Sequence, residues 1–159
     1  MEELIEKRSM SGTWPHVTVA GLVMDEQMRR ACVIYRGENV RSAKNRWALL
    51  TGLLEHGESI DDALRREAEE ELGIPRDSCR VLSGHDGFYQ NFSDGYHWVL
   101  LVRPSVTSEF DSARNAEPDK HDRIEVMGVR ELFTCIAYKD KSFDSNADEF
   151  LLDYLPRFF

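Results

Sequence analysis

Residues 52–74 read GLLEHGESIDDALRREAEEELGI and carry a high density of carboxylates. A helix advances about 100° per residue, so Glu67, Glu70 and Glu71 would lie on one face of it. Glu67 and Glu71 are four residues apart, a spacing at which like charges destabilise an isolated helix by roughly 0.2–0.5 kcal/mol. Oxygen ligands of this kind suit a hard divalent cation. The stretch therefore predicts a site for Mg²⁺ or Mn²⁺.

Both ends of this helix are marked in the sequence. Ser59 is a good N-cap, and Gly73 followed by Pro75 is a typical stop signal. Arg66 stands four residues before Glu70, which is the spacing for a contact that orients a carboxylate. An apolar stripe beside the acidic face would pack on a sheet. Its members are Leu64, Ala68 and Leu72.

The same stretch resembles the Nudix box of the Nudix hydrolases. The match includes Gly52, Glu58, the pair Arg66-Glu67, the pair Glu70-Glu71 and the pair Gly73-Ile74, each at the family's spacing. The resemblance implies an α/β Nudix fold, a mixed β-sheet sandwiched between α-helices. It also implies that the three glutamates of the helix hold the metal and that Arg66 fixes their geometry. A solvated, charge-rich helix face is the simpler alternative, but it would not require these residues in register.

A second segment, residues 115–122 (NAEPDKHD), resembles a stretch found in the MutT-like nucleoside triphosphate pyrophosphohydrolases of this family. By that resemblance Glu117 would be a further metal ligand or the general base. One carboxylate among Glu67, Glu71 and Glu117 would accept the proton of the attacking water. The alternative for Glu117 is an exposed loop carboxylate.

Residues that would bind the nucleotide are less sharply marked. Gly52 would start a tight loop that brings backbone N–H groups near a ligand. Stacking surfaces are offered by Phe88, Tyr89, Tyr96, His97 and Trp98, although aromatic residues on strands more often pack in the core. On a strand, either Tyr96 with Trp98 or His97 alone would line the cleft. A basic cluster could receive phosphates or simply form a solvated turn. It consists of Arg36, Arg41, Lys44 and Arg46. The histidines show no ligand spacing, and none is assigned to the metal.

Composition narrows the choice of function. The chain has 159 residues with 42% hydrophobic and 31% charged residues, which predicts one domain spanning residues 1–159. A net charge of −9 disfavours binding to long nucleic acid or to an anionic membrane. Three scattered cysteines indicate neither a disulfide framework nor a zinc site, and no apolar run could span a bilayer. We expect a cytoplasmic protein, with a homodimer as a possible assembly by analogy with relatives.

The pattern of apolar residues predicts strands at residues 16–24, 31–35, 47–50, 81–90, 96–103 and 123–129. Helices are expected at residues 129–135 and 145–155 in addition to the acidic one, and residues 104–120 are expected to form a long loop.

The resemblance implies metal-dependent hydrolysis of a phosphoanhydride bond in a nucleoside diphosphate derivative. The expected substrate is a nucleoside or deoxynucleoside triphosphate, cleaved to the monophosphate and pyrophosphate. An ADP-ribose, NADH or dinucleoside polyphosphate hydrolase would share the same site. A noncatalytic, nucleotide-sensing binding module is the alternative of another class, and the presence of all three helix glutamates argues against it.

Overall fold

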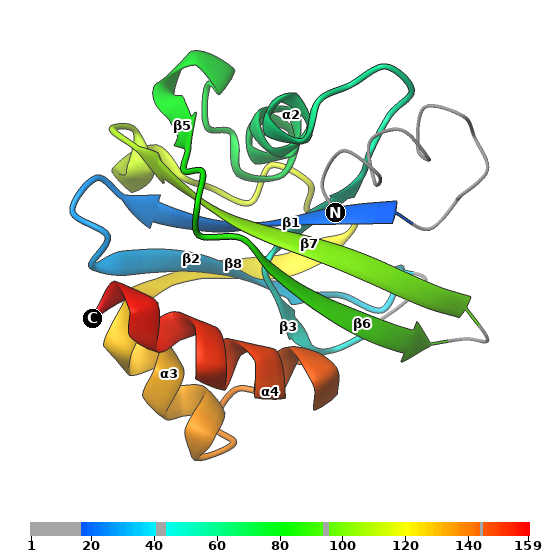
Figure 1. The fold of residues 1–159 in the computed structure, drawn as a ribbon, viewed down its shortest axis with the longest axis vertical. Coiled ribbons are helices and arrows are strands. Elements are labelled where there is room, and N and C mark those ends of the chain that lie inside the picture. Colours follow the sequence, from blue (N-terminus) through cyan, green and yellow to red (C-terminus); the bar gives the residue numbers. More distant parts are fainter. Residues whose placement is uncertain (1–16, 41–43, 94–95, 144) are drawn as a thin grey trace.

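The computed structural model describes residues 17–40, 44–93, 96–143 and 145–159. It consists of one mixed β-sheet with helices on both sides (Figure 1). Helix α2 (Ile60–Leu72) covers one side, and α3 (Val129–Ala137) and α4 (Ser145–Tyr154) cover the other. The expected fold class is therefore confirmed. Among the helices of the described ranges, none has the length and apolar character needed to cross a bilayer.

The sheet contains strands of very different length. They are β1 (Val17–Asp25), β2 (Arg30–Arg36), β3 (Trp47–Ala48), β4 (Leu50–Leu53), β5 (Cys79–Val81), β6 (Gly87–Ser93), β7 (Tyr96–Thr107) and β8 (His121–Gly128). Short 3₁₀ turns lie at η1 (Arg76–Ser78), η2 (Phe110–Ser112) and η3 (Leu155–Phe158).

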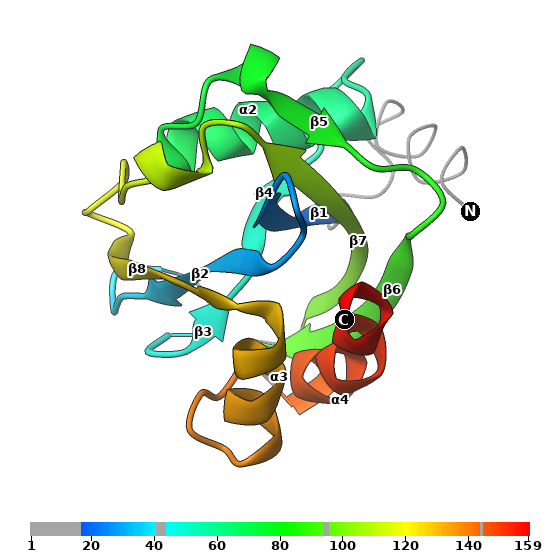
Figure 2. The ribbon, with the colours of Figure 1, turned by 90° about the vertical axis from the view of Figure 1, so that its left-hand side faces the viewer.

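Strand β1 is the centre of the sheet. It runs parallel to β7 along its whole length and antiparallel to β4 and β2. β8 pairs with β2, while β6 and β5 pair with successive parts of β7. The view at right angles shows the strands curving between α2 and the α3–α4 pair (Figure 2).

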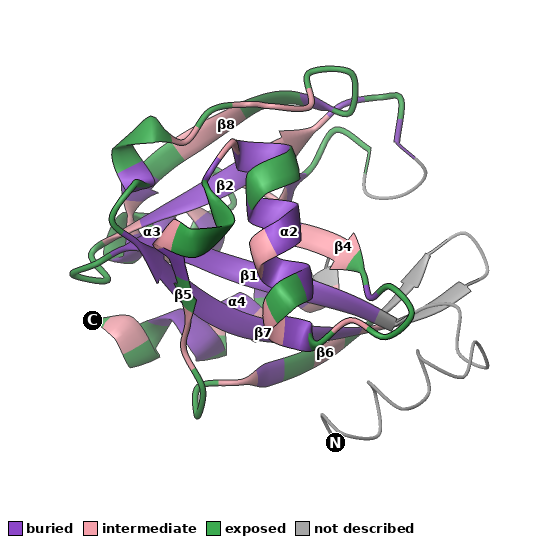
Figure 3. Cartoon of the chain, turned by 90° about the horizontal axis from the view of Figure 1, so that it is seen from above, coloured by how far each residue is buried: buried purple, intermediate pink, exposed green. Residues whose placement is uncertain are grey.

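Both faces of β1 are covered, which explains its nearly continuous apolar sequence. Val19 and Val23 are fully buried on the side of α2, and Leu22 and Met24 are fully buried on the side of α3 and α4. α2 alternates buried and exposed residues along its length (Figure 3). The sheet therefore holds α2 by its apolar side, as the stripe in the sequence predicted.

The strand expected at residues 47–50 is divided between β3 and β4. Two further predicted boundaries are wrong. The single strand expected at residues 81–90 is two strands, because a turn with Gly84 at a φ of 84° separates β5 from β6. In that turn Asp86 accepts hydrogen bonds of 2.8 and 2.7 Å from Arg103 of β7. Tertiary contact therefore stabilises a break that strand propensity did not indicate.

The loop expected at residues 104–120 begins later, because β7 continues to Thr107. Pro104 lies inside this strand although proline lacks an N–H for the ladder. It lies between the part of β7 that pairs with β6, up to Val102, and the part that pairs with β5, from Ser105. The carbonyl of Pro104 accepts the N–H of Leu82 at 2.9 Å. Pro104 therefore makes a hydrogen bond at this edge of the strand, although it has no N–H of its own. The strand tolerates the proline for this reason.

Candidate metal and nucleotide site

Helix α2 has the predicted ends. The side chain of Ser59 accepts the N–H of Asp62 at 3.1 Å, which caps the first turn. Gly73 ends the helix with a φ of 67°, a left-handed conformation that suits glycine. The apolar stripe is buried against the sheet, so the register of the acidic residues is set by packing. The stripe is Leu64, Ala68 and Leu72.

The three carboxylates of the helix do not share one environment. Glu67 and Glu71 are 8% and 6% exposed, whereas the side chain of Glu70 is 46% exposed. Burial raises the pKa of Glu67 to about 7, and the neighbouring charge of Glu71 adds to the rise. Hydrogen bonding and charge from Arg66 oppose it. The buried pair forms the centre of the site, and Glu70 lies at its solvent edge.

Arg66 connects the carboxylates with the loop before the helix. Its Nε and Nη2 donate to the two oxygens of Glu58 at 2.8 and 3.1 Å. Nη1 donates to Glu67 Oε1 at 2.6 Å and to Glu70 Oε2 at 3.4 Å, and Nη2 also reaches the carbonyl of Leu53 at 3.0 Å. Hydrogen bonds to Glu58, then to Glu67, raise the pKa of Arg66. The expected orienting contact with Glu70 is present but is the longest of the set.

Glu58 is fixed by the same guanidinium group. Burial alone would raise the pKa of Glu58, but hydrogen bonds from Arg66 and from the N–H of Glu55 lower it. Glu58 therefore stays ionised and binds Nε and Nη2 of Arg66, while Nη1 binds Glu67.

Gly52 lies within β4, paired with Val19, so the loop begins later than predicted. A Cβ atom at this position would overlap the carboxyl group of Glu67. The glycine thus makes room for a buried carboxylate against the backbone of β4. Its predicted role in substrate binding stays a prediction.

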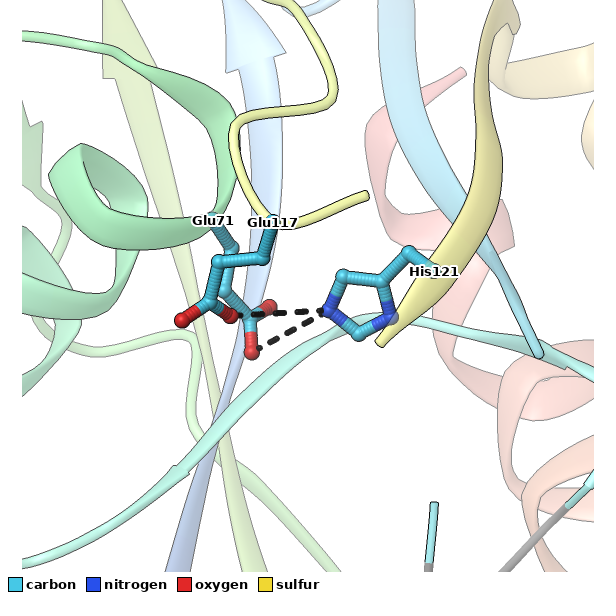
Figure 4. A group of neighbouring side chains, drawn as sticks. All are labelled: Glu71, Glu117 and His121. Atoms are coloured by element: carbon cyan, nitrogen blue, oxygen red, sulfur yellow. Dashed lines mark ion pairs between the residues drawn. The ribbon is translucent and has the colours of Figure 1, made fainter. Parts of the chain in front are cut away.

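The segment after β7 brings Glu117 to the helix. The N–H of Ala116 donates to the carbonyl of Glu71 at 3.0 Å, and the N–H of His121 donates to the carbonyl of Glu117 at 3.1 Å. These bonds place Glu117 and His121 beside Glu71 (Figure 4). The nearness of Glu117 agrees with the sequence prediction. His121 was missed, although its position four residues after Glu117 was the available signal.

Of the aromatic residues Phe88, Tyr96 and Trp98, which were predicted to bind a base, the structure describes the side chain of Phe88. Phe88 lies on β6 opposite Leu101 and is 39% exposed, on the side of the sheet that faces α2. Tyr96 and Trp98 belong to β7, but their side chains lie outside the described part of the structure. The base-binding roles stay predictions.

The residues of the predicted basic cluster do not share one environment in the structure. Arg36 lies at the end of β2, in register with His121, and burial lowers its pKa while the charge of Glu71 opposes that change. Arg46 instead donates to the carbonyl of Phe143 at 2.9 Å, and Arg41 falls outside the described residues. Arg36 thus interacts electrostatically with Glu71 of the site.

These residues fit a divalent cation. Glu71, Glu117 and His121 each direct one ligand atom into a space where those atoms lie within 4.8 Å of one another. Oε2 of Glu117 and both ring nitrogens of His121 are buried, and none of them has a hydrogen-bond partner among the described residues. Buried polar groups are normally satisfied, so these atoms indicate a ligand.

Comparison with known proteins gives a consistent result. Residues 14–154 match the family model described as the NUDIX domain. Nudix hydrolase 7 of Arabidopsis thaliana is 38% identical over 90 residues, and the match covers 54% of this chain but only 32% of that protein. The chain therefore matches about a third of the length of this curated relative.

Solved structures show the same fold at low identity. The MutT protein from Methanosarcina mazei Go1 has a TM-score of 0.68 and 16% identity, with 89% of this chain and 94% of that chain covered. An Ap4A hydrolase of C. elegans, in a binary complex, has a TM-score of 0.67 and 10% identity, with 89% and 96% covered. A MutT NUDIX hydrolase from Burkholderia pseudomallei has a TM-score of 0.61 and 23% identity, with 89% and 98% covered.

Proposed function

Because the chain belongs to the NUDIX family, we propose that it hydrolyses a phosphoanhydride bond in a nucleoside diphosphate derivative with a divalent cation. The observation that supports this most directly is the buried pair Glu67 and Glu71, held by Arg66 and seated against Gly52. Burying two carboxylates side by side is costly unless a cation compensates them. Arg66 hydrogen-bonds Glu67 of the pair. The charge of the second buried carboxylate favours the binding of a metal ion.

Each residue has a role that follows from its position. Glu67, Glu70 and Glu71 would hold the cation, which when bound neutralises phosphate charge and lowers the pKa of the attacking water. Arg66 keeps Oε1 of Glu67 in place and leaves the other oxygen for coordination. The oxygen of water attacks phosphorus, and the bond from phosphorus to the bridging oxygen breaks with its electron pair on the departing phosphate. Glu67, Glu71 or Glu117 accepts the water proton.

For the substrate, we favour a nucleoside or deoxynucleoside triphosphate that yields a monophosphate and pyrophosphate. The resemblance of residues 115–122 to MutT-like proteins supports this choice, together with the position of Glu117 beside Glu71. The net charge of −9 agrees with a small substrate rather than long nucleic acid.

The alternatives are hydrolysis of a different substrate by the same reaction and a binding function without catalysis. ADP-ribose, NADH and dinucleoside polyphosphates contain the same type of bond, and the shared fold of the C. elegans Ap4A hydrolase is compatible with the last of these. A noncatalytic binding module would not need the full set of glutamates. Cytoplasmic location and homodimer formation stay predictions, to be tested by cell fractionation and light scattering.

The experiment is a substrate panel under three metal conditions. Nucleoside triphosphates, ADP-ribose, NADH and diadenosine polyphosphates are each incubated with Mg²⁺, with Mn²⁺ and with EDTA, and the products are separated and identified. Pyrophosphate release from triphosphates that EDTA abolishes is the expected result. Turnover of another compound of the panel instead would show that the proposed substrate is wrong and the proposed reaction is right. No turnover of any compound would refute the proposed hydrolase.

Matched variants tie the activity to the site. Glu71→Gln should lose at least about 100-fold in turnover, because an amide is a poor ligand for Mg²⁺. Glu69→Gln is the control, since Glu69 lies on the same helix but is exposed and paired with Arg76. Equal activity of the two variants would contradict the assignment.

A further inference from the structure

His121 is a buried histidine whose ring lacks hydrogen-bond partners within the described ranges of the chain. The residue is 2% exposed, and neither Nδ1 nor Nε2 has a partner in the part of the chain that the structure describes. Nε2 lies 3.5 Å from Oε1 of Glu71 and 3.9 Å from Oε2 of Glu117 (Figure 4). Leaving polar ring atoms unsatisfied in a protein interior costs free energy. The ring thus lies at ion-pair distance from two carboxylates and forms no hydrogen bond with either of them.

The backbone around this ring is firmly held. The Nδ2 group of Asn115 donates to the carbonyl of His121 at 2.7 Å, and the N–H of His121 donates to the carbonyl of Glu117 at 3.1 Å. His121 is also the first residue of β8, which pairs with β2. The position of the ring therefore results from a turn and a strand that are both hydrogen-bonded.

The carboxylate of Glu117 is oriented as well. Lys120 donates to Oε1 of Glu117 at 3.0 Å, so the other oxygen, Oε2, is the one nearer His121. That oxygen is buried and has no hydrogen-bond partner within the described chain. Glu117 thus presents one free oxygen toward the same space as the imidazole.

We propose that Glu71, Glu117 and His121 form a mixed carboxylate–imidazole site that binds Mn²⁺ and similar transition-metal ions in preference to Mg²⁺. Imidazole nitrogen is a good ligand for first-row transition metals, whereas Mg²⁺ prefers oxygen. Ligands about 2.1 Å from an ion stand roughly 3–4 Å apart, so the distances of 3.5 and 3.9 Å need little change. Three protein ligands leave positions for water or a phosphate oxygen. The site deepens the proposed function, on which any role in hydrolysis rests.

The test measures metal binding without turnover. Metal-free protein is titrated with Mn²⁺ and with Mg²⁺ by calorimetry, and the Mn²⁺-loaded protein is examined by pulsed EPR for coupling to ¹⁴N. The expected results are a Mn²⁺ affinity at least about tenfold above that for Mg²⁺ and a ¹⁴N signal from a bound imidazole. Absence of the nitrogen coupling from wild-type protein would overturn the proposal.

Variants separate a ligand from a charged neighbour. His121→Gln places an amide oxygen near the position of Nε2, and should lower Mn²⁺ affinity about tenfold or more, remove the ¹⁴N signal and change Mg²⁺ affinity much less. His85→Gln is the control, because His85 is an exposed histidine in the turn before β6. Glu117→Gln provides a second ligand variant with a partly exposed side chain, in case His121→Gln does not fold. Unchanged Mn²⁺ affinity in folded ligand variants would refute the site.

The substrate panel keeps the two proposals apart. Hydrolysis with Mg²⁺ by a protein that shows no nitrogen coupling would refute the mixed site and leave the proposed function standing. A Mn²⁺ site with the nitrogen ligand in a protein that cleaves nothing in the panel would support the site and refute the hydrolase.

Discussion

Replacing Arg66 with alanine tests whether the acidic site is held together by one buried cation. The side chain of Arg66 is 10% exposed and bonds Glu58 and Glu67, whose side chains are 13% and 10% exposed. Arg66→Ala would remove the hydrogen bonds that Arg66 gives to both carboxylates and would leave Glu67 beside the charge of Glu71. Removing one member of a buried ion pair costs about 3–5 kcal/mol, since the remaining charge is desolvated and uncompensated.

The control is an arginine that pairs at the surface. Arg76 contacts Glu69 at 3.0 Å with both side chains about half exposed, at 49% and 47%. A pair of this kind contributes about 0–1 kcal/mol. Arg76→Ala should therefore change the free energy of unfolding by no more than about 1 kcal/mol.

Urea unfolding followed by circular dichroism, in the presence of EDTA, measures both variants without contributions from metal. A loss of about 3–5 kcal/mol corresponds to a fall in Tm of roughly 6–20 °C for a chain of this size. Arg66→Lys should recover only part of the loss, because one ammonium group cannot bond two carboxylates from a fixed position.

A second substitution identifies the cause of the loss. Glu67→Gln in the Arg66→Ala background removes one uncompensated charge, so it should restore part of the stability if electrostatics dominate. An Arg66→Ala protein within about 1 kcal/mol of wild type would refute the reasoning, and so would a double variant that is less stable than Arg66→Ala alone.

Further predictions concern a glycine, a metal ion and Asp25, the buried last residue of β1. Gly52→Ala should reduce both Mn²⁺ affinity and activity, because the added Cβ would displace the carboxyl group of Glu67. Gly128→Ala is the control and should leave both unchanged, because a Cβ there would lie 3.7 Å from the nearest atom. Calorimetry measures the affinity, and a turnover assay measures the activity. Saturating Mg²⁺ or Mn²⁺ should raise Tm relative to EDTA, with about 2.7 kcal/mol of stabilisation at one hundred times Kd, and a flat Tm in a thermal scan would contradict metal binding to the folded state. Burial would raise the pKa of Asp25, but hydrogen bonds from the backbone N–H groups of Arg30 and Arg29 lower it, so the pKa is lower in the folded than in the unfolded protein. The ionised carboxylate therefore stabilises the fold above about pH 4. This stabilisation is lost as the pH falls through the folded pKa. Asp25→Asn should therefore be less stable than wild type at pH 7, with the difference shrinking in acid, as unfolding curves between pH 7 and pH 2 would show.

Local patterns identified the elements whose determinants are close together in the chain. The ends of α2 depend on a side chain at Ser59 and a left-handed residue at Gly73, and both are within a few residues of the helix. The break between β5 and β6 depends instead on Arg103, which lies 17 residues after Asp86. A strand boundary that depends on a distant residue leaves only a weak signal in the local sequence, so the pattern of apolar residues did not predict this break.

The same distinction applies to the site. By itself the sequence determined that carboxylates with a metal-binding spacing lie on one helix, because the period of a helix is set by local backbone geometry. It did not reveal that Glu67 and Glu71 are buried while Glu70 is exposed, since burial depends on what packs against the helix. Only the tertiary structure brought His121 to Glu71, fifty positions away in the chain, because that contact arises from the pairing of β8 with β2 and the tether of the preceding segment to α2.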